Sequence, residues 1–291
     1  MTTNTTNKVT VIGLGDMGAV LAGTLLQHGY EVTVWNRSPE KAAPLQSAGA
    51  HAPASLTAAI TASPIVIVCV TNYNISSSLL QTPEATAALK GRVLVELTSG
   101  IPQEARTAEQ WATSNGIGYI DGAILATPSQ MGRPDTPLFV SGAAAAWQQS
   151  EPALRTLAGG IAYMGEDAGA AATWDIGFLI TMFGAMSGFF HGAKVFAAEG
   201  IPISALGNMI HQVAPVIGEM IKRQGDTIES GDYSNPESSL DICANGMDLF
   251  IQHARQSNIS TDVPVFIKSI LKRAQDAGFG KEQVAATFKT L

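Results

Sequence analysis

The spacing of apolar residues changes near residue 165, and this change predicts the architecture of the chain. Before that point, short β-rich runs alternate with segments of helical pattern. Such alternation is typical of an α/β protein whose parallel sheet is doubly wound, with helices on both faces. After Gly165 the strand signals stop and only helical patterns follow. We therefore predict an α/β domain over residues 1–165 and an all-helical second half.

The strands are predicted from runs rich in β-branched and other apolar residues. The run 64–70 is apolar throughout, as expected for a strand that is covered on both faces. Between the strands, helical patterns cover residues 55–63, 102–114 and 143–157. The predicted strands are residues 8–13, 31–35, 64–70, 92–97, 119–124, 138–141 and 161–164.

The second half begins with an unusually long helical pattern, residues 168–199. It has no ionisable side chain between Ile176 and Phe190, and Asp175 stands at the upstream edge of this apolar run. The run is shorter than the roughly 20 apolar residues of a membrane span. We expect no membrane span but a helix buried by another domain or subunit. Further helices are predicted at residues 204–230, 238–256, 262–277 and 281–290.

A glycine-rich turn joins the first predicted strand to the first helix. Its sequence fits G-x-G-x-x-G, with a second strand following on schedule. In this motif the first glycine permits a tight turn, the second lets a pyrophosphate approach, and the third lets helix and strand pack closely. The free N–H groups of the helix start then face the phosphates. The motif predicts a dinucleotide site that includes Gly13, Leu14, Gly15, Asp16, Met17 and Gly18.

The end of the second strand favours NADPH over NADH. An NAD site usually places an acid here to accept a hydrogen bond from the ribose 2′-OH. This chain has no acid at the strand end; Asn36 is followed by Arg37 and Ser38, with Lys41 close behind. These donors suit a 2′-phosphate, although a solvated basic loop would give the same pattern.

Three further residues of the expected cofactor site follow other strands. Val70 and Thr71 end the third strand, and Thr98 ends the fourth. Ligands of open parallel sheets lie at the carboxyl ends of the strands. We expect these residues to complete the NADPH site.

Composition and charge exclude several other functions. The formal net charge is −7, which argues against a nucleic-acid partner. Cys69 and Cys243 are the only cysteines, so neither a disulfide framework nor a zinc site is indicated, and the histidines show no metal-ligand spacing. The polar first residues lack a signal-peptide pattern, so a cytoplasmic location is expected. Hydrophobic residues make up 46% and charged residues 14%, which suggests extensive burial between domains or subunits.

Three segments together resemble the NADPH-dependent imine reductases and reductive aminases, which are related to the β-hydroxyacid dehydrogenases. Residues 13–38 hold GLGDMG and end in VWNRS, residues 121–128 read DGAILATP, and residues 165–175 read GEDAGAAATWD. The resemblance covers most of the chain, more loosely after Glu199. It implies NADPH as cofactor and a small imine, amine or ketone as substrate. The implied reaction is hydride transfer to the carbon of a C=N bond, giving an amine.

The resemblance also implies the organisation of the chain. A Rossmann domain (1–165) is followed by an interdomain helix (166–199) and by a helical dimerisation and substrate domain (200–291), similar to the C-terminal domain of 6-phosphogluconate dehydrogenase. It further implies a homodimer that exchanges helices and shares its active sites.

The catalytic residue expected from this resemblance is Asp175. The hydroxyacid branch carries a lysine on the interdomain helix, whereas this chain has no lysine between Lys90 and Lys194. A carboxylate favours a cationic iminium and disfavours a ligand that carries a carboxylate. Asp175 could donate a proton to a neutral imine or stay ionised and anchor an iminium; the structural alternative is an acid that caps or pairs at a helix start.

The expected substrate pocket combines helix and strand-end residues. Helical spacing puts Leu179, Met182 and Met186 on the face of Asp175, although each could equally be an ordinary core residue. Trp174 stands where many relatives carry tyrosine. Ser99 and Thr127 could hydrogen-bond the substrate nitrogen; relatives with reductive aminase activity often have asparagine at the place matched to Ser99, so efficient coupling of ketone and amine is not implied.

Two other functions remain open from the sequence. The first is a divergent β-hydroxyacid dehydrogenase-like carbonyl oxidoreductase. The second, of a different class, is a nucleotide-binding sensor that binds NADPH without catalysis. The physiological substrate and the stereochemical outcome are not encoded in any motif.

Overall fold

The structure is a computed structural model that describes residues 7–291. The chain forms two compact units, one ending at Ile180 and the other comprising Thr181–Leu291. Helix α8 (Gly169–Ala198) contributes its first part to one unit and the remainder to the other. The first unit has two hydrophobic clusters of buried residues and the second unit has one, within the described residues.

The first unit is built on a seven-stranded sheet with the order β2-β1-β3-β4-β5-β6-β7. All neighbours are parallel except β5 and β6, which are antiparallel. The chain passes from β1 to β2 on one side and then crosses back from β2 to β3 on the other side of β1. The strand order therefore reverses between β1 and β3, and a ligand crevice is expected at the carboxyl ends of these strands. The strands are β1 (Lys8–Ile12), β2 (Glu31–Trp35), β3 (Ile65–Val68), β4 (Val93–Glu96), β5 (Gly118–Ile124), β6 (Pro137–Gly142) and β7 (Gly160–Tyr163).

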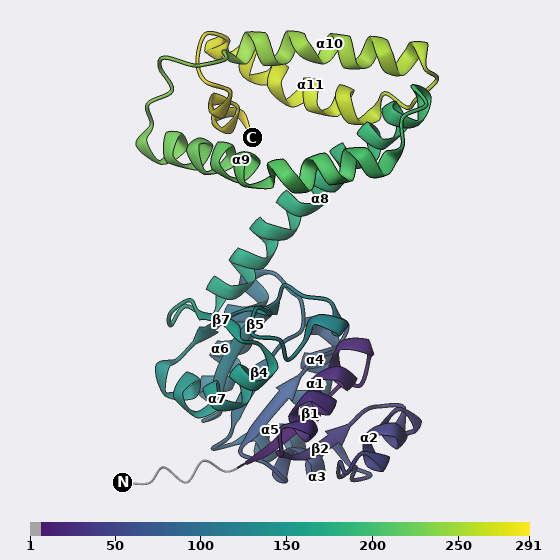
Figure 1. The fold of residues 1–291 in the computed structure, drawn as a ribbon. Helices are drawn as coiled ribbons and strands as arrows, with labels where there is room; N and C mark the ends of the chain where they lie inside the picture. The colour runs from purple at the N-terminus through teal and green to yellow at the C-terminus, as the bar shows by residue number, and fades with distance from the viewer. Residues whose placement is uncertain (1–6) are drawn as a thin grey trace. The chain divides into compact units, whose positions relative to one another are not determined.

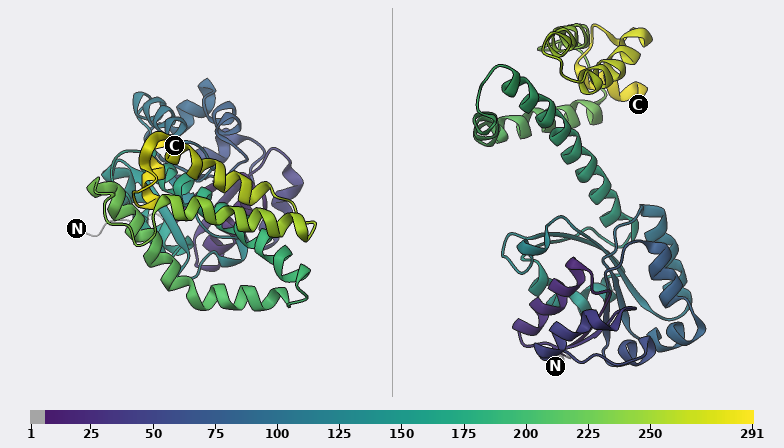
Figure 2. Two further views of the ribbon diagram at one scale, coloured as in Figure 1. Left: turned by 90° about the horizontal axis from the view of Figure 1, so that it is seen from above. Right: turned by 90° about the vertical axis from the view of Figure 1, so that its right-hand side faces the viewer.

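Helices cover both faces of this sheet, as Figures 1 and 2 show. One face packs against α1 (Asp16–Gln27), α2 (Ala43–Ser47) and α7 (Ala144–Leu157). The other packs against α3 (Leu56–Thr61), α4 (Tyr73–Leu80), α5 (Pro83–Leu89) and α6 (Pro102–Ser114). Alternate residues of one strand enter different clusters; Val11 packs on the first face and Ile12 on the second. This two-sided burial confirms the predicted doubly wound fold.

The sequence pattern located each of the seven strands, and the predicted strand ends differ from the observed ones by a few residues at most. The helices α4 and α5 were missed because residues 73–89 lack a clear apolar periodicity. Their starts do carry caps, since the Asn72 side chain accepts from the Ile75 N–H at 3.0 Å and Thr82 accepts from the Ala85 N–H at 3.2 Å. The short helix α2 and the 3₁₀ turn η1 (Pro39–Ala42) before it were also missed.

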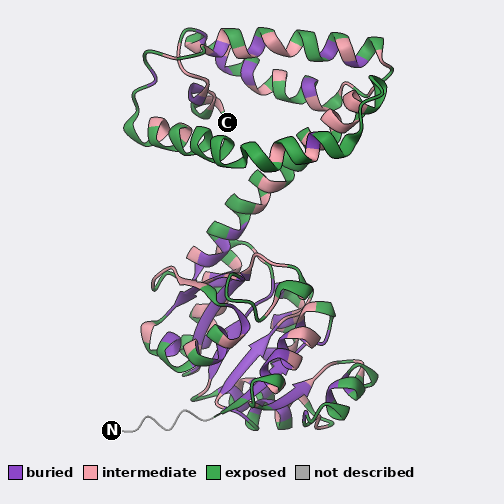
Figure 3. Cartoon of the chain, in the orientation of Figure 1, coloured by how far each residue is buried: buried purple, intermediate pink, exposed green. Residues whose placement is uncertain are grey.

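The second unit is helical, as predicted, but its interior is small. After α8 come α9 (Ile203–Ser230), α10 (Leu240–Gln256) and α11 (Asp262–Ala274). A single π turn, η3 (Gln275–Phe279), follows, and the predicted last α-helix is instead a 3₁₀ segment, η4 (Val284–Thr290). Figure 3 shows that α9 is exposed along most of its length. The buried cluster of this unit consists of Tyr233, Ala285 and Ala286.

Candidate active site

A cavity of about 420 Å³ opens at the carboxyl ends of β1 and β3. It lies at the point where the strand order reverses, which is where ligands of open α/β sheets bind. Its lining comes from the glycine-rich turn, the end of β2, the end of β3 and helix α4. The lining residues are Gly13, Leu14, Gly15, Asp16, Met17, Gly18, Trp35, Asn36, Arg37, Ser38, Lys41, Cys69, Val70, Thr71, Ile75, Ser78 and Leu79.

Each of the three glycines of the turn is explained by a different structural feature. Gly13 has φ of +93°, and a Cβ there would lie 2.2 Å from the Cys69 carbonyl oxygen. A Cβ on Gly18 would lie 1.9 Å from the Gly13 carbonyl oxygen, so this glycine permits the close packing of helix and turn. A Cβ on Gly15 would meet no atom within 4 Å. Gly15 therefore borders open space in the cavity, where a ligand can approach the backbone.

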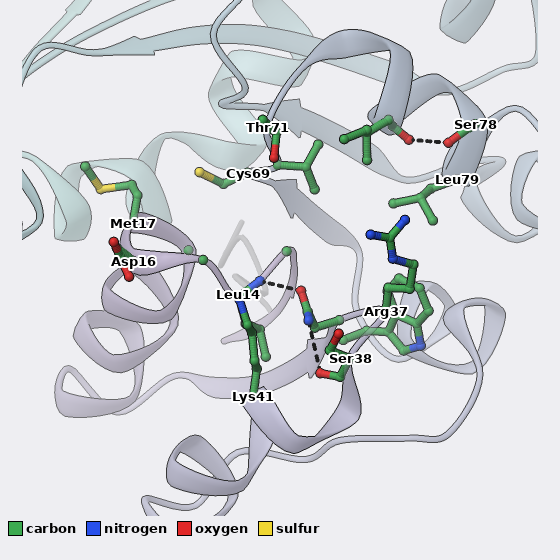
Figure 4. Close-up of a pocket in the computed structure, with 17 residues that line it drawn as sticks. Leu14, Asp16, Met17, Arg37, Ser38, Lys41, Cys69, Thr71, Ser78 and Leu79 are labelled. Carbon is green, nitrogen blue, oxygen red and sulfur yellow. Dashed lines mark hydrogen bonds between the residues drawn. The ribbon is translucent and has the colours of Figure 1, made fainter.

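The start of α1 is suited to an anion. Gly15 is the N-cap and supplies no side-chain acceptor to the first helical N–H groups. Such unpaired N–H groups at a helix start, with the helix dipole, bind phosphate. The Leu14 N–H donates to Asn36 Oδ1 at 3.0 Å, and Asn36 Nδ2 donates to the Ser38 carbonyl oxygen at 3.0 Å (Figure 4). Asn36 thus fixes the loop after β2 against the glycine-rich turn.

The basic loop after β2 contributes Arg37, Ser38 and Lys41 to the cavity. Figure 4 shows the Arg37 guanidinium directed toward Leu79 of α4. In the part of the chain that the structure describes, no carboxylate forms a salt bridge with Arg37 or Lys41. Their charges are therefore available to a ligand, and the set fits the 2′-phosphate of NADPH.

Thr98 is the one predicted cofactor residue that does not line the cavity. It is buried, and its Oγ1 accepts from the Val70 N–H at 3.1 Å, so it supports the strand end that does. Five lining residues were not predicted from the sequence. Trp35 and Cys69 adjoin predicted residues and could have been found by position. Ile75, Ser78 and Leu79 belong to the missed helix α4.

Asp175 is buried in the first unit, with an exposed fraction of 6%. The first turns of α8 place Gly169, Ala171, Ala172 and Asp175 on one buried face. Ser141 of β6 holds this end of the helix: its Oγ accepts from the Ala171 N–H at 3.0 Å and donates to the Ala168 carbonyl oxygen at 2.9 Å. Burial raises the pKa of the Asp175 carboxyl above its usual value.

The other predicted substrate residues lie in more open surroundings. Ser99 and Thr127 are exposed at strand ends, and Thr127 Oγ1 donates to Gln130 Oε1 at 2.9 Å. Trp174 is 54% exposed, with its ring 5.6 Å from that of Phe139. Leu179 is half-buried in the first unit. Met182 and Met186 fall in the second unit, further along the same helix.

Family models match both parts of the chain. The model of the NAD binding domain of 6-phosphogluconate dehydrogenase matches residues 8–165. The model of the NADPH-dependent reductive aminase-like C-terminal domain matches residues 167–291. The NADPH-dependent reductive aminase of Aspergillus oryzae is 30% identical over 95% of this chain and 94% of its own length. The chain belongs to the imine reductase and reductive aminase family.

Solved structures of the family agree with the whole fold. The imine reductase of Myxococcus stipitatus in complex with NADP+ has a TM-score of 0.89 at 34% identity, covering 97% of this chain and 99% of that one. The reductive aminase of Aspergillus terreus in complex with NADPH4, cyclohexanone and allyl amine has a TM-score of 0.88 at 30% identity, covering 97% and 98%. The family resemblance of the three sequence segments is therefore confirmed.

Proposed function

We infer that this chain is an NADPH-dependent oxidoreductase that reduces C=N bonds of imines or iminium ions to amines, the chemistry of the family to which it belongs. The observation that best supports this function is the combination of two features. The glycine-rich cavity includes a basic loop whose Arg37 and Lys41 form no salt bridge in the described residues, and the acid Asp175 is buried near the start of α8. NADPH bound in this cavity would supply the hydride. The chain itself supplies the cavity, the orientation and a group that handles the proton.

We propose Asp175 as that group. Hydride arriving at the carbon of a C=N bond leaves negative charge on nitrogen unless a proton is already there or arrives with it. A carboxyl with a raised pKa can donate the proton to a neutral imine; the carboxylate can instead hold a protonated iminium next to it. Burial, which is the cause of the raised pKa, also strengthens attraction to a cation because little water screens the charge.

The β-hydroxyacid dehydrogenase-like alternative is less well supported. An acid stands on α8, and the sequence has no lysine between Lys90 and Lys194 to bind a substrate carboxylate or to act as the acid of a carbonyl reduction. The sensor alternative predicts NADPH binding without turnover. An assay of NADPH consumption with imine substrates therefore distinguishes the sensor from the enzyme.

Replacing Asp175 tests this role. Asp175→Asn keeps the shape of the side chain and removes the proton, so kcat with a cyclic imine such as a pyrroline should fall by about 100-fold or more. NADPH affinity should stay within about twofold, because the cavity lining does not include Asp175. Asp135→Asn is the matched control, since Asp135 is exposed and pairs with Arg133 on the surface. Unchanged kcat in Asp175→Asn would refute the role; turnover of a 3-hydroxy acid and of no imine would refute the function.

We propose that Ser99, Thr127 and Trp174 line the substrate side, with Leu179, Met182 and Met186 as apolar walls from α8. The hydroxyls of Ser99 and Thr127 sit at carboxyl ends of strands, where they can hydrogen-bond a substrate nitrogen. Preformed imines are expected to react faster than mixtures of ketone and amine. Parallel assays of a cyclic imine and of cyclohexanone with a primary amine measure this directly.

We propose a homodimer in which helices are exchanged and the active sites are shared. The second unit exposes a row of large apolar side chains on α9, including Val216 at 61% and Met220 at 60%. It also has an apolar cavity of about 460 Å³ between α8, α10 and α11, lined by Phe196, Phe250 and Ile267 among others. By length and composition α8 could also cross a membrane. We favour instead a second copy of the chain as the partner that covers these apolar surfaces, because contiguous apolar surfaces of this kind are typical of obligate dimers.

Sedimentation of the purified chain tests this assembly. A mass of twice 30.3 kDa is expected, and Val216→Glu should shift the protein to the monomer and lower kcat. Lys222→Glu is the control on the same helix, since Lys222 is exposed and lies on the side of α9 opposite Val216 and Met220. A monomeric, fully active wild type would contradict the proposal. The functional division that we propose is residues 1–165 for NADPH, 166–199 for the interdomain helix and 200–291 for dimerisation, in a cytoplasmic enzyme.

A further inference from the structure

Three acids are buried in the described part of the first unit: Glu96, Asp121 and Asp175, with exposed fractions of 2%, 2% and 6%. Glu96 of β4 and Asp121 of β5 are register partners on neighbouring parallel strands. Register partners point to the same face of a sheet, here the face covered by α4 and α6. Two of these acids have no part in the proposed reaction, although burying a carboxyl is costly.

Asp121 is held by a pair of tyrosines. The Tyr73 hydroxyl, from α4, donates to Asp121 Oδ1, and the Tyr119 hydroxyl donates to the same oxygen at 3.4 Å. The two hydroxyls lie 3.2 Å apart. Glu96 has separate donors, the Ser76 hydroxyl and the Thr98 N–H at 3.2 Å. Both carboxyls are thus fixed in place by neutral donors.

The structure also connects Asp121 to Asp175. Ser141 of β6 is the register partner of Asp121, and its Oγ accepts from the Ala171 N–H at the start of α8. Asp175 follows Ala171 by four residues, on the same buried helix face. One helical turn rises about 5.4 Å, so the Ser141 contact brings Asp175 into the neighbourhood of Asp121, and the charge of Asp175 is one of the smaller influences that raise the pKa of Asp121. In the described residues, the titratable groups whose charge or hydrogen bonds affect the pKa of Asp121 are Tyr73, Glu96, Tyr119 and Asp175, and none of them is a cation.

We propose that Asp121 is a second acid behind Asp175 that determines how strongly the active site attracts a positively charged substrate or product. The proposal rests on the role of Asp175 given above. When Asp121 is ionised, the site presents two negative charges to an iminium or ammonium group; when Asp121 is protonated, it presents one at most. Asp121 acts through the field and through Asp175, and it need not touch the substrate.

The protonation of Asp121 changes in a useful pH range. Burial raises the pKa of Asp121 to about 7; the hydrogen bond from Tyr73 lowers the pKa, and the charges of Glu96 and Asp175 raise it. Asp121 is therefore mainly protonated below about pH 7 and mainly ionised above it. A cation bound at Asp175 cancels part of the repulsion between the two acids, so it lowers the pKa of Asp121. By linkage, an ionised Asp121 strengthens cation binding by the same factor.

Binding of a saturated cyclic amine to the NADP+-loaded protein tests the proposal. The amine is chosen so that it stays protonated from pH 5.5 to 9, and its Kd is measured across that range. The wild type should bind about 3- to 10-fold more tightly above pH 7 than below, which corresponds to a coupling of about 0.5 to 1 pKa unit between the two carboxyls. Asp121→Asn keeps an oxygen acceptor for Tyr73 but carries no charge, so the affinity step should become smaller and should reflect only the ionisation of Asp175 and Glu96.

Two further variants separate charge from structure. Glu96→Gln removes the neighbouring buried acid, so the affinity step should remain but move to lower pH, since the charge of Glu96 raises the pKa of Asp121. Tyr73→Phe removes a donor to the carboxylate, so the step should move to higher pH. A structural role alone would change affinity equally at every pH. An affinity step of undiminished size in Asp121→Asn would overturn the proposal.

A measurement that does not need Asp121→Asn remains decisive if that variant does not fold. Calorimetry in buffers of different ionisation enthalpy should show proton release when the cationic amine binds near pH 7, and the release should persist in Glu96→Gln, which lacks the other buried acid with a pKa of about 7. No proton release between pH 6 and 8 would overturn the proposal. A wrong assignment of Asp175 would give a different result. Asp175→Asn would then retain wild-type turnover, independently of any result obtained for Asp121.

Discussion

The basic loop after β2 gives a quantitative prediction about cofactor choice. Arg37 and Lys41 line the cavity without a carboxylate partner in the described residues. A charge-assisted hydrogen bond contributes about 1.5–3 kcal/mol when it is shielded from water. Arg37 is exposed, so the lower part of this range applies. Arg37→Ala should therefore weaken NADPH binding by about 1.5–2 kcal/mol, or about 10- to 30-fold in Kd.

NADH lacks the 2′-phosphate, so its Kd should change by less than about twofold in Arg37→Ala. Fluorescence titrations of both cofactors measure the two constants, and repeating them at higher salt should reduce the NADPH preference of the wild type. Arg133→Ala is the matched control, because Arg133 is an exposed arginine that pairs with Asp135 outside the cavity. Equal losses for NADPH and NADH in Arg37→Ala would refute the assignment of this loop to the 2′-phosphate.

Two predictions concern stability. Gly18→Ala puts a Cβ 1.9 Å from the Gly13 carbonyl oxygen and should lower the free energy of unfolding by about 1–3 kcal/mol in urea titrations. The control is Gly23→Ala on the same helix, whose Cβ meets no atom within 4 Å; it should raise the free energy of unfolding by about 0.5–1 kcal/mol. Equal effects of the two substitutions would contradict the packing argument. Glu96 has its pKa raised from 4.5 to about 7 by burial, partly offset by hydrogen bonds from Ser76 and Thr98. The native state therefore binds the proton more tightly than the unfolded state, and Glu96 makes the free energy of unfolding fall as pH rises from 4.5 to about 7. Glu96→Gln should gain stability relative to wild type across this interval, and a difference that is constant with pH would contradict the prediction.

The order of the strands in the first unit could be read from the sequence because each strand has a strong local signal. The strands are apolar runs covered on both faces, and the glycine-rich turn requires glycine for reasons that act within a few residues. The cofactor site was predictable for the same reason, since most of its lining follows directly on a strand. Helices α4 and α5 were missed because short capped helices have little periodicity, and with α4 the lining residues Ile75, Ser78 and Leu79 were missed too.

Only the tertiary structure brought together groups from distant parts of the chain. Tyr73, Glu96, Asp121 and Asp175 lie on α4, β4, β5 and α8, and no spacing in the sequence relates them. Sheet register puts Glu96 beside Asp121, and Ser141, the register partner of Asp121, holds the start of α8. Their raised pKa values depend on this burial, because desolvation is a property of the assembled core and not of any local segment. The sequence by itself thus determined the strands, the family and the presence of an acid near the start of α8, whereas the fold decided the buried environment of that acid.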